Sequence, residues 1–171
     1  MKKIVVLTGA GVSAESGVAT FRDADGLWEG HDVMEVATPE GFRKNPSLVQ
    51  TFYNQRRAAL KKVEPNPEHY AIKTLEDKYQ VVVITQNVDD LHERAGSSQV
   101  IHLHGELRKV KSTIDPDYII PWEEDLNMGD CCPKGGQLRP QVVWFGEAVP
   151  MIEPAAMECM STDIVIIIGT S

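Results

Sequence analysis

The chain has 171 residues, 42% of them hydrophobic, which is enough for one domain with a buried core and is typical of a globular protein. A formal net charge of -8 argues against nonspecific nucleic-acid binding and suits lysine-containing peptides better. No apolar stretch reaches the ~20 residues that span a bilayer, and the N-terminus turns glycine-rich too early for a signal peptide. Three cysteines, an odd number, fit a reducing compartment. We therefore predict a cytoplasmic protein with no membrane partner.

A glycine-rich turn follows the first apolar run, Ile4–Leu7, and reads TGAGVSAESG. Its Gly9-x-Gly11-x-x-Ala14 pattern stands between a strand and a helix start. In such turns the first glycine permits the bend, the second lets the backbone approach a pyrophosphate, the small third residue lets the helix pack closely, and free N–H groups attract anions. The turn predicts a dinucleotide site, with a plain glycine-rich turn as the alternative. No second strand ending in Asp or Glu follows about 20 residues later, so the cofactor is expected to be held differently than in a dehydrogenase.

Strand-like and helix-like segments alternate along the chain. Apolar runs without a polar face predict four strands of a buried parallel sheet: Ile4–Leu7, Val81–Thr85, Val142–Phe145 and Ile164–Ile168. Helix starts are predicted where an Asn cap precedes a proline, at Asn45-Pro46 and Asn66-Pro67. This order predicts a doubly wound, Rossmann-like α/β fold. The segment 109–136, rich in Pro, Asp, Glu and Gly, is predicted to be a small irregular inserted module within one catalytic domain, 1–171.

The chain ends at the carboxyl end of the last predicted strand, Ile168-Gly169-Thr170-Ser171. In an α/β sheet ligands bind at this edge, and another connection and strand are expected to follow. We therefore expect this chain to be a truncated product of a longer protein, with the C-terminal part of its fold missing.

A predicted helix over residues 47–63 carries an arginine in its apolar face. At about 100° per residue, the apolar positions fall within an arc of roughly 140°: Leu48, Val49, Phe52, Tyr53, Ala59, Leu60 and Val63. Arg56 lies near the middle of this arc, whereas Arg57 lies at its edge, where we expect a solvated charge. An inward guanidinium needs an anion. Two interpretations stay open: a substrate carboxylate that the Tyr53 hydroxyl also binds, or a salt bridge to the protein itself or simple snorkelling.

Polar side chains follow the second predicted strand, at Gln86, Asn87 and Asp89. They lie at the sheet edge where the glycine-rich turn is also expected. They fit a ribose or an amide, but helix capping is the commoner use of Asn and Asp here. The alternating run from Val100 to Gly105 is predicted to place both of its histidines on one face, and His104 is a candidate general base, although a structural role is commoner.

Six segments in this order resemble the sirtuins: Gly9–Gly17, Phe21–Arg22, Thr85–Asp89, His104–Gly105, Arg139–Glu147 and Gly169–Ser171. The resemblance covers essentially the whole chain. It implies an NAD-dependent protein-lysine deacylase, in which the acyl oxygen attacks C1′ of the nicotinamide ribose, nicotinamide leaves, and the acyl group ends on ADP-ribose. It also implies acylated-lysine proteins as substrates.

The resemblance assigns roles to individual residues. His104 would be the general base, Asn87 and Asp89 would orient the ribose and the nicotinamide amide, and Phe21 would shield the reactive carbon. The implied NAD pocket comprises Gly9, Ala10, Gly11, Ser13, Ala14, Phe21, Arg22, Trp28, Gln86, Asn87, Val88, Asp89, Gly169, Thr170 and Ser171. The implied substrate residues are Tyr53, Arg56, Val142, Phe145, Gly146 and Glu147. The segment Val142–Glu147 would line the acyl-lysine tunnel and bind the peptide as an added strand.

Tyr53 and Arg56 are similar to the Tyr-x-x-Arg pair of class III sirtuins, which prefer succinyl and malonyl groups. This agrees with the helix-face argument and favours the carboxylate interpretation. Bacterial members with this pair also remove acetyl groups, so acetyl-lysine is expected as a further substrate.

The chain departs from the family at its cysteines. Most sirtuins hold a structural zinc with two Cys-x-x-Cys pairs, but here only Cys131-Cys132 stands near the second, and Lys109–Thr113 stands where the first is expected. Adjacent cysteines cannot easily give two of four tetrahedral ligands, so we predict no zinc.

Three other functions are weighed against deacylation. A mono-ADP-ribosyltransferase would share the cofactor pocket, and a noncatalytic NAD or acyl-lysine binding module is suggested by the chain end and the missing zinc ligands. A simple dehydrogenase is disfavoured by the missing ribose-binding acid. Oligomeric state and target proteins do not follow from the sequence.

Overall fold

The computed structural model describes residues 1–19 and 27–170, which form two compact units. The sheet unit comprises Met1–Thr20, Val63–Gly105 and Ala148–Ser171. The helical unit comprises Phe21–Lys62 and Glu106–Glu147. Each unit is built from segments far apart in the sequence.

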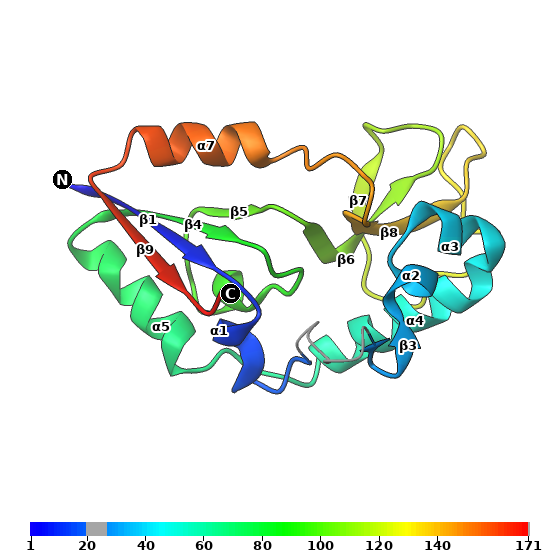
Figure 1. The fold of residues 1–171 in the computed structure, drawn as a ribbon, viewed down its shortest axis with the longest axis horizontal. Helices are drawn as coiled ribbons and strands as arrows, with labels where there is room; N and C mark the ends of the chain where they lie inside the picture. Colours follow the sequence, from blue (N-terminus) through cyan, green and yellow to red (C-terminus); the bar gives the residue numbers. More distant parts are fainter. Residues whose placement is uncertain (20–26, 171) are drawn as a thin grey trace. The chain divides into compact units, whose positions relative to one another are not determined.

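A four-stranded parallel sheet forms the centre of the sheet unit (Figure 1), with the strand order β5-β4-β1-β9. Its strands are β1 (Lys3–Thr8), β4 (Gln80–Thr85), β5 (Val100–His102) and β9 (Ile164–Ile168). The register aligns Thr8 with Thr85 and with Ile168, so the carboxyl ends of three strands meet at one edge. This edge is where an α/β sheet binds its ligands.

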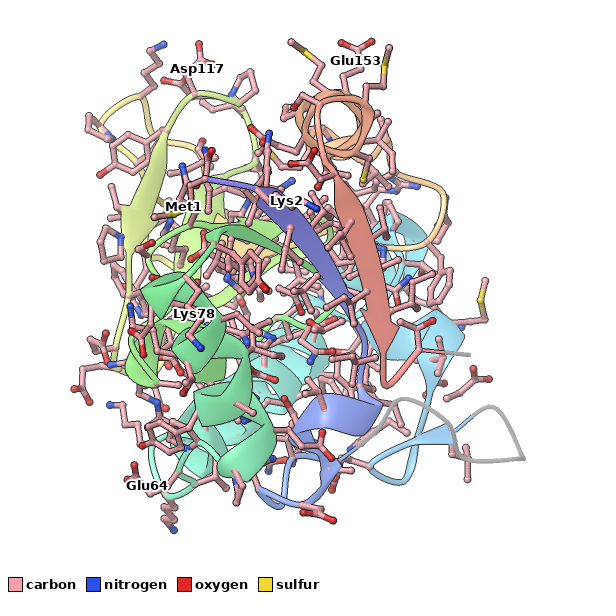
Figure 2. The ribbon with its side chains drawn as sticks, turned by 90° about the vertical axis from the view of Figure 1, so that its left-hand side faces the viewer. Met1, Lys2, Glu64, Lys78, Asp117 and Glu153 are labelled. Carbon is pink, nitrogen blue, oxygen red and sulfur yellow. The ribbon has the colours of Figure 1, made fainter. Side chains whose placement is uncertain are left out.

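Helices cover both faces of this sheet, as a doubly wound fold requires. The helices are α1 (Gly11–Ala14), α5 (Pro67–Thr74), the 3-10 helix η1 (Leu75–Asp77), α6 (Leu91–Arg94) and α7 (Ile152–Met160). On one face Val12 and Ile72 pack against Ile4, Val6 and Val83; on the other, Ala155 of α7 packs against strand residues of opposite parity. Figure 2 shows α7, marked by Glu153, and α5, above Glu64, on opposite sides of β1 and β9. Because successive strand side chains point to opposite faces, both faces are apolar.

Both predicted asparagine caps are confirmed. In the sheet unit, Asn66 Oδ1 accepts from the Glu68 N–H at 2.9 Å, and His69 completes a capping box at the start of α5. In the helical unit, Asn45 Oδ1 accepts from the Leu48 N–H at 3.2 Å at the start of α4. The proline that follows each cap loses no helical hydrogen bond, because the first N–H of a helix has no partner within it.

The helical unit combines three helices with two small sheets. Its elements are β2 (Leu27–Trp28), β3 (His31–Asp32), α2 (Val33–Val36), α3 (Pro39–Lys44), α4 (Pro46–Leu60), β6 (Gly105–Ser112), β7 (Ile119–Pro121) and β8 (Leu138–Val142). A two-residue hairpin joins β2 to β3, with positive φ at both Glu29 (49°) and Gly30 (80°). The strand order in the other sheet is β7-β6-β8, over a core that includes Val110, Leu126 and Leu138.

Two strand predictions were wrong. Val142–Phe145 is not a strand of the parallel sheet: β8 ends at Val142, and it belongs to the helical unit. The fourth parallel strand is instead β5, whose three residues are too short for a periodicity argument. The predicted strand Ile164–Ile168 exists, but it lies at the sheet edge and Ile167 is 64% exposed, so its burial was overestimated. Within 1–19 and 27–170, no helix is long and apolar enough to cross a membrane.

Candidate active site

The glycine-rich turn is held against the end of β9. The N–H of Gly9 donates to the Ile168 carbonyl at 3.2 Å, and that of Gly11 donates to the Gly169 carbonyl at 2.9 Å. A Cβ on Gly9 would come within 2.7 Å of the Gly169 oxygen, and one on Gly11 within 2.8 Å of its Cα. Both glycines are therefore required by a close approach of two backbone segments.

Two details predicted for this turn were wrong. The N–H groups of Gly9, Gly11, Val12 and Ser13 all donate to backbone carbonyls, so they are not free for an anion in this structure. The short helix α1 also leaves the side chain of Ala14 exposed, so Ala14 does not serve close packing. What the turn does provide at the carboxyl edge of the sheet is exposed Gly11 beside half-buried Ala10.

Asn87 ties the end of β4 to this turn. Its Nδ2 donates to the Gly9 carbonyl at 3.0 Å and lies 3.3 Å from Ser13 Oγ. Capping, the commoner use of such a residue, does not apply here, because neither bond is made to a helix N-terminus. With both amide hydrogens committed to the protein, the side-chain oxygen of Asn87 is the atom that can accept from a ligand.

Asp89 partly fulfils the capping expectation, because its Oδ1 accepts from the Leu91 N–H at 3.1 Å. The carboxyl group is buried, and burial raises its pKa, although hydrogen bonds from the Leu91 N–H and the Ser13 hydroxyl oppose the rise. A carboxylate that is already desolvated interacts strongly with any donor that reaches it.

His69 fixes the direction of the hydrogen bonds behind Asp89. The Asn66 N–H donates to His69 Nδ1 at 3.1 Å, so this nitrogen carries no hydrogen. Burial, followed by the charge of Arg94, lowers the pKa of His69 and keeps the ring neutral. Its hydrogen is therefore on Nε2, which donates to Ser13 Oγ at 3.3 Å, and the Ser13 hydroxyl is left to donate to Asp89.

A second buried histidine braces the adjacent strand ends. Thr8 Oγ1 donates to Thr85 Oγ1 at 2.9 Å, so it accepts from His92 Nε2 at the same distance. Burial is the main cause that lowers the pKa of His92 to about 4. Its Nδ1 is buried and has no hydrogen-bond partner, so a proton added there would find no acceptor. Sequence reasoning missed both histidines. The available signal was their position in the first turn of a helix, since His69 lies two residues after the first residue of α5 and His92 one residue after the first residue of α6.

His104 lies in the turn after β5, so the predicted alternating strand ends earlier, at His102, and the two histidines do not share a strand face. His104 Nδ1 lies 3.1 Å from the Gln86 carbonyl oxygen, which can only accept. The hydrogen of the neutral ring is thus on Nδ1, and Nε2 presents a lone pair that can take a proton.

The sheet unit therefore brings together most of the predicted cofactor residues at one edge. These are Gly9, Ala10, Gly11, Ser13, Gln86, Asn87, Val88, Asp89, His104, Gly169 and Thr170. Phe21, Arg22 and Ser171, also predicted for this pocket, lie outside the described residues. Trp28 belongs to the helical unit, where its ring packs edge-on against Phe52 at 4.9 Å and Tyr53 at 5.9 Å between ring centroids.

In the helical unit, Tyr53 of α4 lies in an aromatic cluster with Phe52, Trp28 and Trp144. Its side chain is 0% exposed. The hydroxyl oxygen accepts from the Trp144 Nε1–H at 3.0 Å. Burial raises the pKa of Tyr53 well above its usual range, although the Trp144 hydrogen bond and Arg139 oppose the rise, so the phenol keeps its proton at neutral pH.

Arg56, one turn further along α4, lies over the Phe52 ring at 4.9 Å. Its Nη2 is 3.9 Å from a carboxylate oxygen of Glu29, while its Nη1 is buried with no hydrogen-bond partner. The internal salt bridge that was one of the two interpretations therefore exists, but it is long and leaves a donor unused. A half-buried guanidinium with an unused donor can still take an anion.

The expectation that Arg57 is solvated was wrong. Arg57 is 1% exposed, and its Nε donates to the Leu107 carbonyl at 3.1 Å. Its Nη1 donates to Asn54 Oδ1 at 2.9 Å and to the Glu124 carbonyl at 3.3 Å. The segments 106–108 and 123–126 cover this side of α4 with carbonyl groups, which helical periodicity alone cannot foresee.

The segment Val142–Glu147 is held by a clamp of charged and aromatic groups. Both carboxylate oxygens of Glu147 accept from Arg139, at 2.8 and 2.9 Å, and one also accepts from the Trp144 N–H at 2.8 Å. The Arg139 guanidinium stacks on the Trp144 ring at 3.4 Å from its centroid. Val142 is buried and Phe145 is 51% exposed, with Gly146 at φ 86°. Trp144, which sequence reasoning did not single out, is the centre of this segment.

The residues present do not fit the structural zinc of most sirtuins. Cys131 is exposed, and the buried Cys132 Sγ accepts from the Ser112 hydroxyl at 3.2 Å. Within the described part of the chain, neither cysteine belongs to a cluster of three or more metal-ligating side chains. Four ligands are needed for a closed tetrahedral site.

The comparisons with known proteins agree with this geometry. Residues 9–171 match the model of the Sir2 family. The chain is 60% identical over 171 residues to an NAD-dependent protein deacylase of Helicobacter pylori, covering all of this chain and 75% of that protein. It is 57% identical over 177 residues to one of Bacteroides thetaiotaomicron, with coverage of 100% and 76%.

Solved structures are similar as well. A Sir2 homologue–NAD complex has a TM-score of 0.89 at 45% identity, over 99% of this chain and 68% of that one. A Sir2 homologue bound to ADP-ribose has a TM-score of 0.90 at 45% identity, over 99% of this chain and 70% of that one. The chain therefore belongs to the Sir2 family of NAD-dependent protein-deacylating enzymes.

Proposed function

We propose that this protein removes succinyl and malonyl groups, and also acetyl groups, from lysine side chains of proteins, with release of nicotinamide and O-acyl-ADP-ribose. The observation that carries the acyl preference is the pair Tyr53 and Arg56, a buried phenol and a guanidinium whose Nη1 has no partner. A carboxylate at the end of an acyl chain accepts from both groups, whereas an acetyl group cannot.

The carboxyl edge of the parallel sheet would bind NAD. The bound dinucleotide supplies the electrophilic ribose carbon to which the acyl group is transferred. Exposed Gly11 and half-buried Ala10 would lie near the phosphates, the Asn87 oxygen would accept from the nicotinamide amide or the ribose, and the Asp89 carboxylate would accept from a ribose hydroxyl. His104 Nε2 takes up a proton as general base, because its Nδ1–H is held by the Gln86 carbonyl.

The segment 142–147 would bind the substrate peptide. Its Arg139–Glu147 clamp uses both Glu147 oxygens, so in this proposal Glu147 acts on the substrate through the loop backbone and not as a free charge. Exposed Phe145 and the backbone around Gly146 are the groups that meet an extended peptide.

Arg56→Met tests the acyl pocket. Acetyl-lysine and succinyl-lysine peptides of one sequence are incubated with the 171-residue chain, with and without NAD, and the products are followed by mass spectrometry. We expect kcat/KM on succinyl-lysine to fall about 10- to 100-fold, the loss of one charged hydrogen bond of about 1.5–3 kcal/mol, and to fall far less on acetyl-lysine. Arg43→Met, which removes an exposed arginine of the same unit, is the matched control.

Equal losses on the two peptides would show that Arg56 is structural and would contradict the acyl preference. Binding of NAD and peptide without loss of either acyl group would favour a noncatalytic binding module. Transfer of ADP-ribose to protein, without loss of the acyl group, would favour a mono-ADP-ribosyltransferase.

A further inference from the structure

The geometry around Tyr53 points to Trp144 as a positioning residue for acyl selectivity: we propose that its indole N–H directs the Tyr53 hydroxyl proton toward the substrate carboxylate. This inference rests on the proposed function, since it concerns the same pocket. It adds a residue that makes no direct contact with the carboxylate.

The two side chains differ in their hydrogen-bonding capacity. An indole N–H can only donate, whereas a phenol oxygen can accept and its single hydrogen can donate once. Because Trp144 Nε1 lies 3.0 Å from the Tyr53 oxygen, Tyr53 must be the acceptor in this pair. The phenol hydrogen therefore points away from Trp144, and it is available to a second acceptor.

Because Tyr53 is buried, the direction of its hydroxyl hydrogen matters for substrate binding. The Tyr53 side chain is fully buried among Phe52, Trp28 and Trp144, so no bulk water competes for its hydrogen. A neutral phenol without Trp144 could rotate its O–H among several directions and would have to be ordered by each incoming substrate. The indole N–H closes one of these directions before the substrate arrives. The hydroxyl is therefore preorganised for an anionic acceptor.

Trp144 is itself held on two sides. Its backbone N–H donates to Glu147, and the Arg139 guanidinium, which Glu147 binds through two hydrogen bonds, lies on its ring at 3.4 Å. Phe42 packs against the same ring, with centroids 5.3 Å apart. The indole thus has little freedom to turn its N–H away from Tyr53.

A phenylalanine at position 144 would keep an aromatic ring, but it would remove the N–H donor together with one ring of the indole. The effect of the lost donor must therefore be separated from the effect of the lost volume. A second probe keeps the size of the ring system: incorporation of 3-benzothienylalanine at position 144 replaces the indole N–H with sulfur, which cannot donate.

The test is a double-mutant cycle in the full 171-residue chain, with Trp144→Phe, Tyr53→Phe and the double variant, on matched succinyl-lysine and acetyl-lysine peptides. We expect Trp144→Phe to lower the succinyl-to-acetyl ratio of kcat/KM about fivefold, the effect of one neutral hydrogen bond. In the Tyr53→Phe background, the same change should leave the ratio unaltered, since no hydroxyl remains to be directed. The benzothienyl variant should behave like Trp144→Phe.

An equal fall on both peptides in Trp144→Phe and in the benzothienyl variant would overturn the inference, because a purely structural role lowers both. A fall in the ratio that persists in the Tyr53→Phe background would overturn it as well. Arg56→Met separates this outcome from failure of the proposed function: if Arg56→Met lowers the ratio and Trp144→Phe does not, only the role of Trp144 is wrong. If neither lowers it, the pocket does not select charged acyl groups.

Discussion

At the scale of single residues, the most unusual feature is a pair of buried neutral histidines behind the edge of the parallel sheet. His69 and His92 have their rings 5.0 Å apart between centroids, and each bonds a hydroxyl of a strand end or turn. Burial is the first cause that lowers the pKa of each. A fold that keeps imidazoles neutral in this way must lose stability when they are forced to take up protons.

His92 gives the clearest test of this coupling. Its pKa is about 4 in the folded chain and about 6.5 in an unfolded one, so the unfolded state binds more protons as the pH falls below 6.5. The free energy of unfolding should therefore decrease between about pH 6.5 and pH 4, by up to about 3 kcal/mol from this group. His92→Gln should be less stable at pH 7 but should show a shallower decrease, measured by urea unfolding at several pH values. Parallel pH profiles of the two proteins would contradict the assignment, since the carboxyl groups titrate in both.

The sequence foresaw the helix caps better than it foresaw the distant partners of individual side chains. Asn66 and Asn45 were correctly predicted as caps because capping depends on neighbours in the chain. Arg57 was wrongly predicted as solvated because the carbonyl groups that bind it come from residues 50 and 67 positions away. The same limit applies to Trp144, whose meaning depends on Tyr53, 91 residues earlier.

At the scale of elements, α2 and α3 pack through the backbone of Gly41. A Cβ at this position would lie 2.2 Å from the Glu35 carbonyl oxygen and 2.7 Å from its carbon. Gly41 also donates its N–H to Thr38 Oγ1 at 2.9 Å, the cap of α3. The last turn of α2 therefore lies directly on the first turn of α3.

Gly41→Ala should separate these two helices. Because the colliding atoms are backbone and cannot rotate aside, we expect a loss of about 2 kcal/mol or more in the free energy of unfolding. Thermal unfolding measures it, with Glu40→Ala, an exposed position of the same helix, as the control. Equal melting temperatures for the two variants would show that the helices can shift at little cost.

Elements with strong local signals were predicted well, and short or tertiary elements were not. The three strands β1, β4 and β9 are apolar runs that pair in parallel as expected. The strand β5 has only three residues and could not be identified by periodicity. The apolar run Val142–Phe145 was wrongly assigned to the parallel sheet, because an apolar run does not reveal its partner, and only Val142 belongs to a strand, β8. The segment 109–136, expected to be irregular, contains β7 paired with β6.

At the scale of the whole molecule, the chain forms two units and passes from one to the other four times. Most of the residues predicted to bind the dinucleotide fall in the sheet unit, whereas Trp28 and the residues predicted to bind the acyl group fall in the helical unit. Ligands should therefore protect different parts of the sequence when they bind separately.

Hydrogen exchange can test this division. NAD or ADP-ribose at 100 times its Kd should slow exchange in segments 9–14 and 86–89 of the sheet unit, up to about 100-fold where exchange requires release of the ligand. A succinyl-lysine peptide alone should instead slow exchange in segment 142–147. The core strand β6 serves as an internal reference that neither ligand should change. Protection by NAD confined to the helical unit would contradict the predicted cofactor edge.

The pairing of Arg56 with Glu29 has a consequence for the proposed range of substrates. Glu29 lies at the tip of the β2–β3 hairpin, so Arg56 has a counter-ion within the protein. In the function proposed above, an incoming succinyl carboxylate would take over a position at the guanidinium from Glu29 instead of meeting an isolated charge. The acyl selectivity would then be the difference in affinity between two carboxylates that compete for one cation, which is smaller than the full strength of either pair. A neutral acetyl group would leave the internal pair intact. Such a pocket would favour acidic acyl groups and still admit neutral ones.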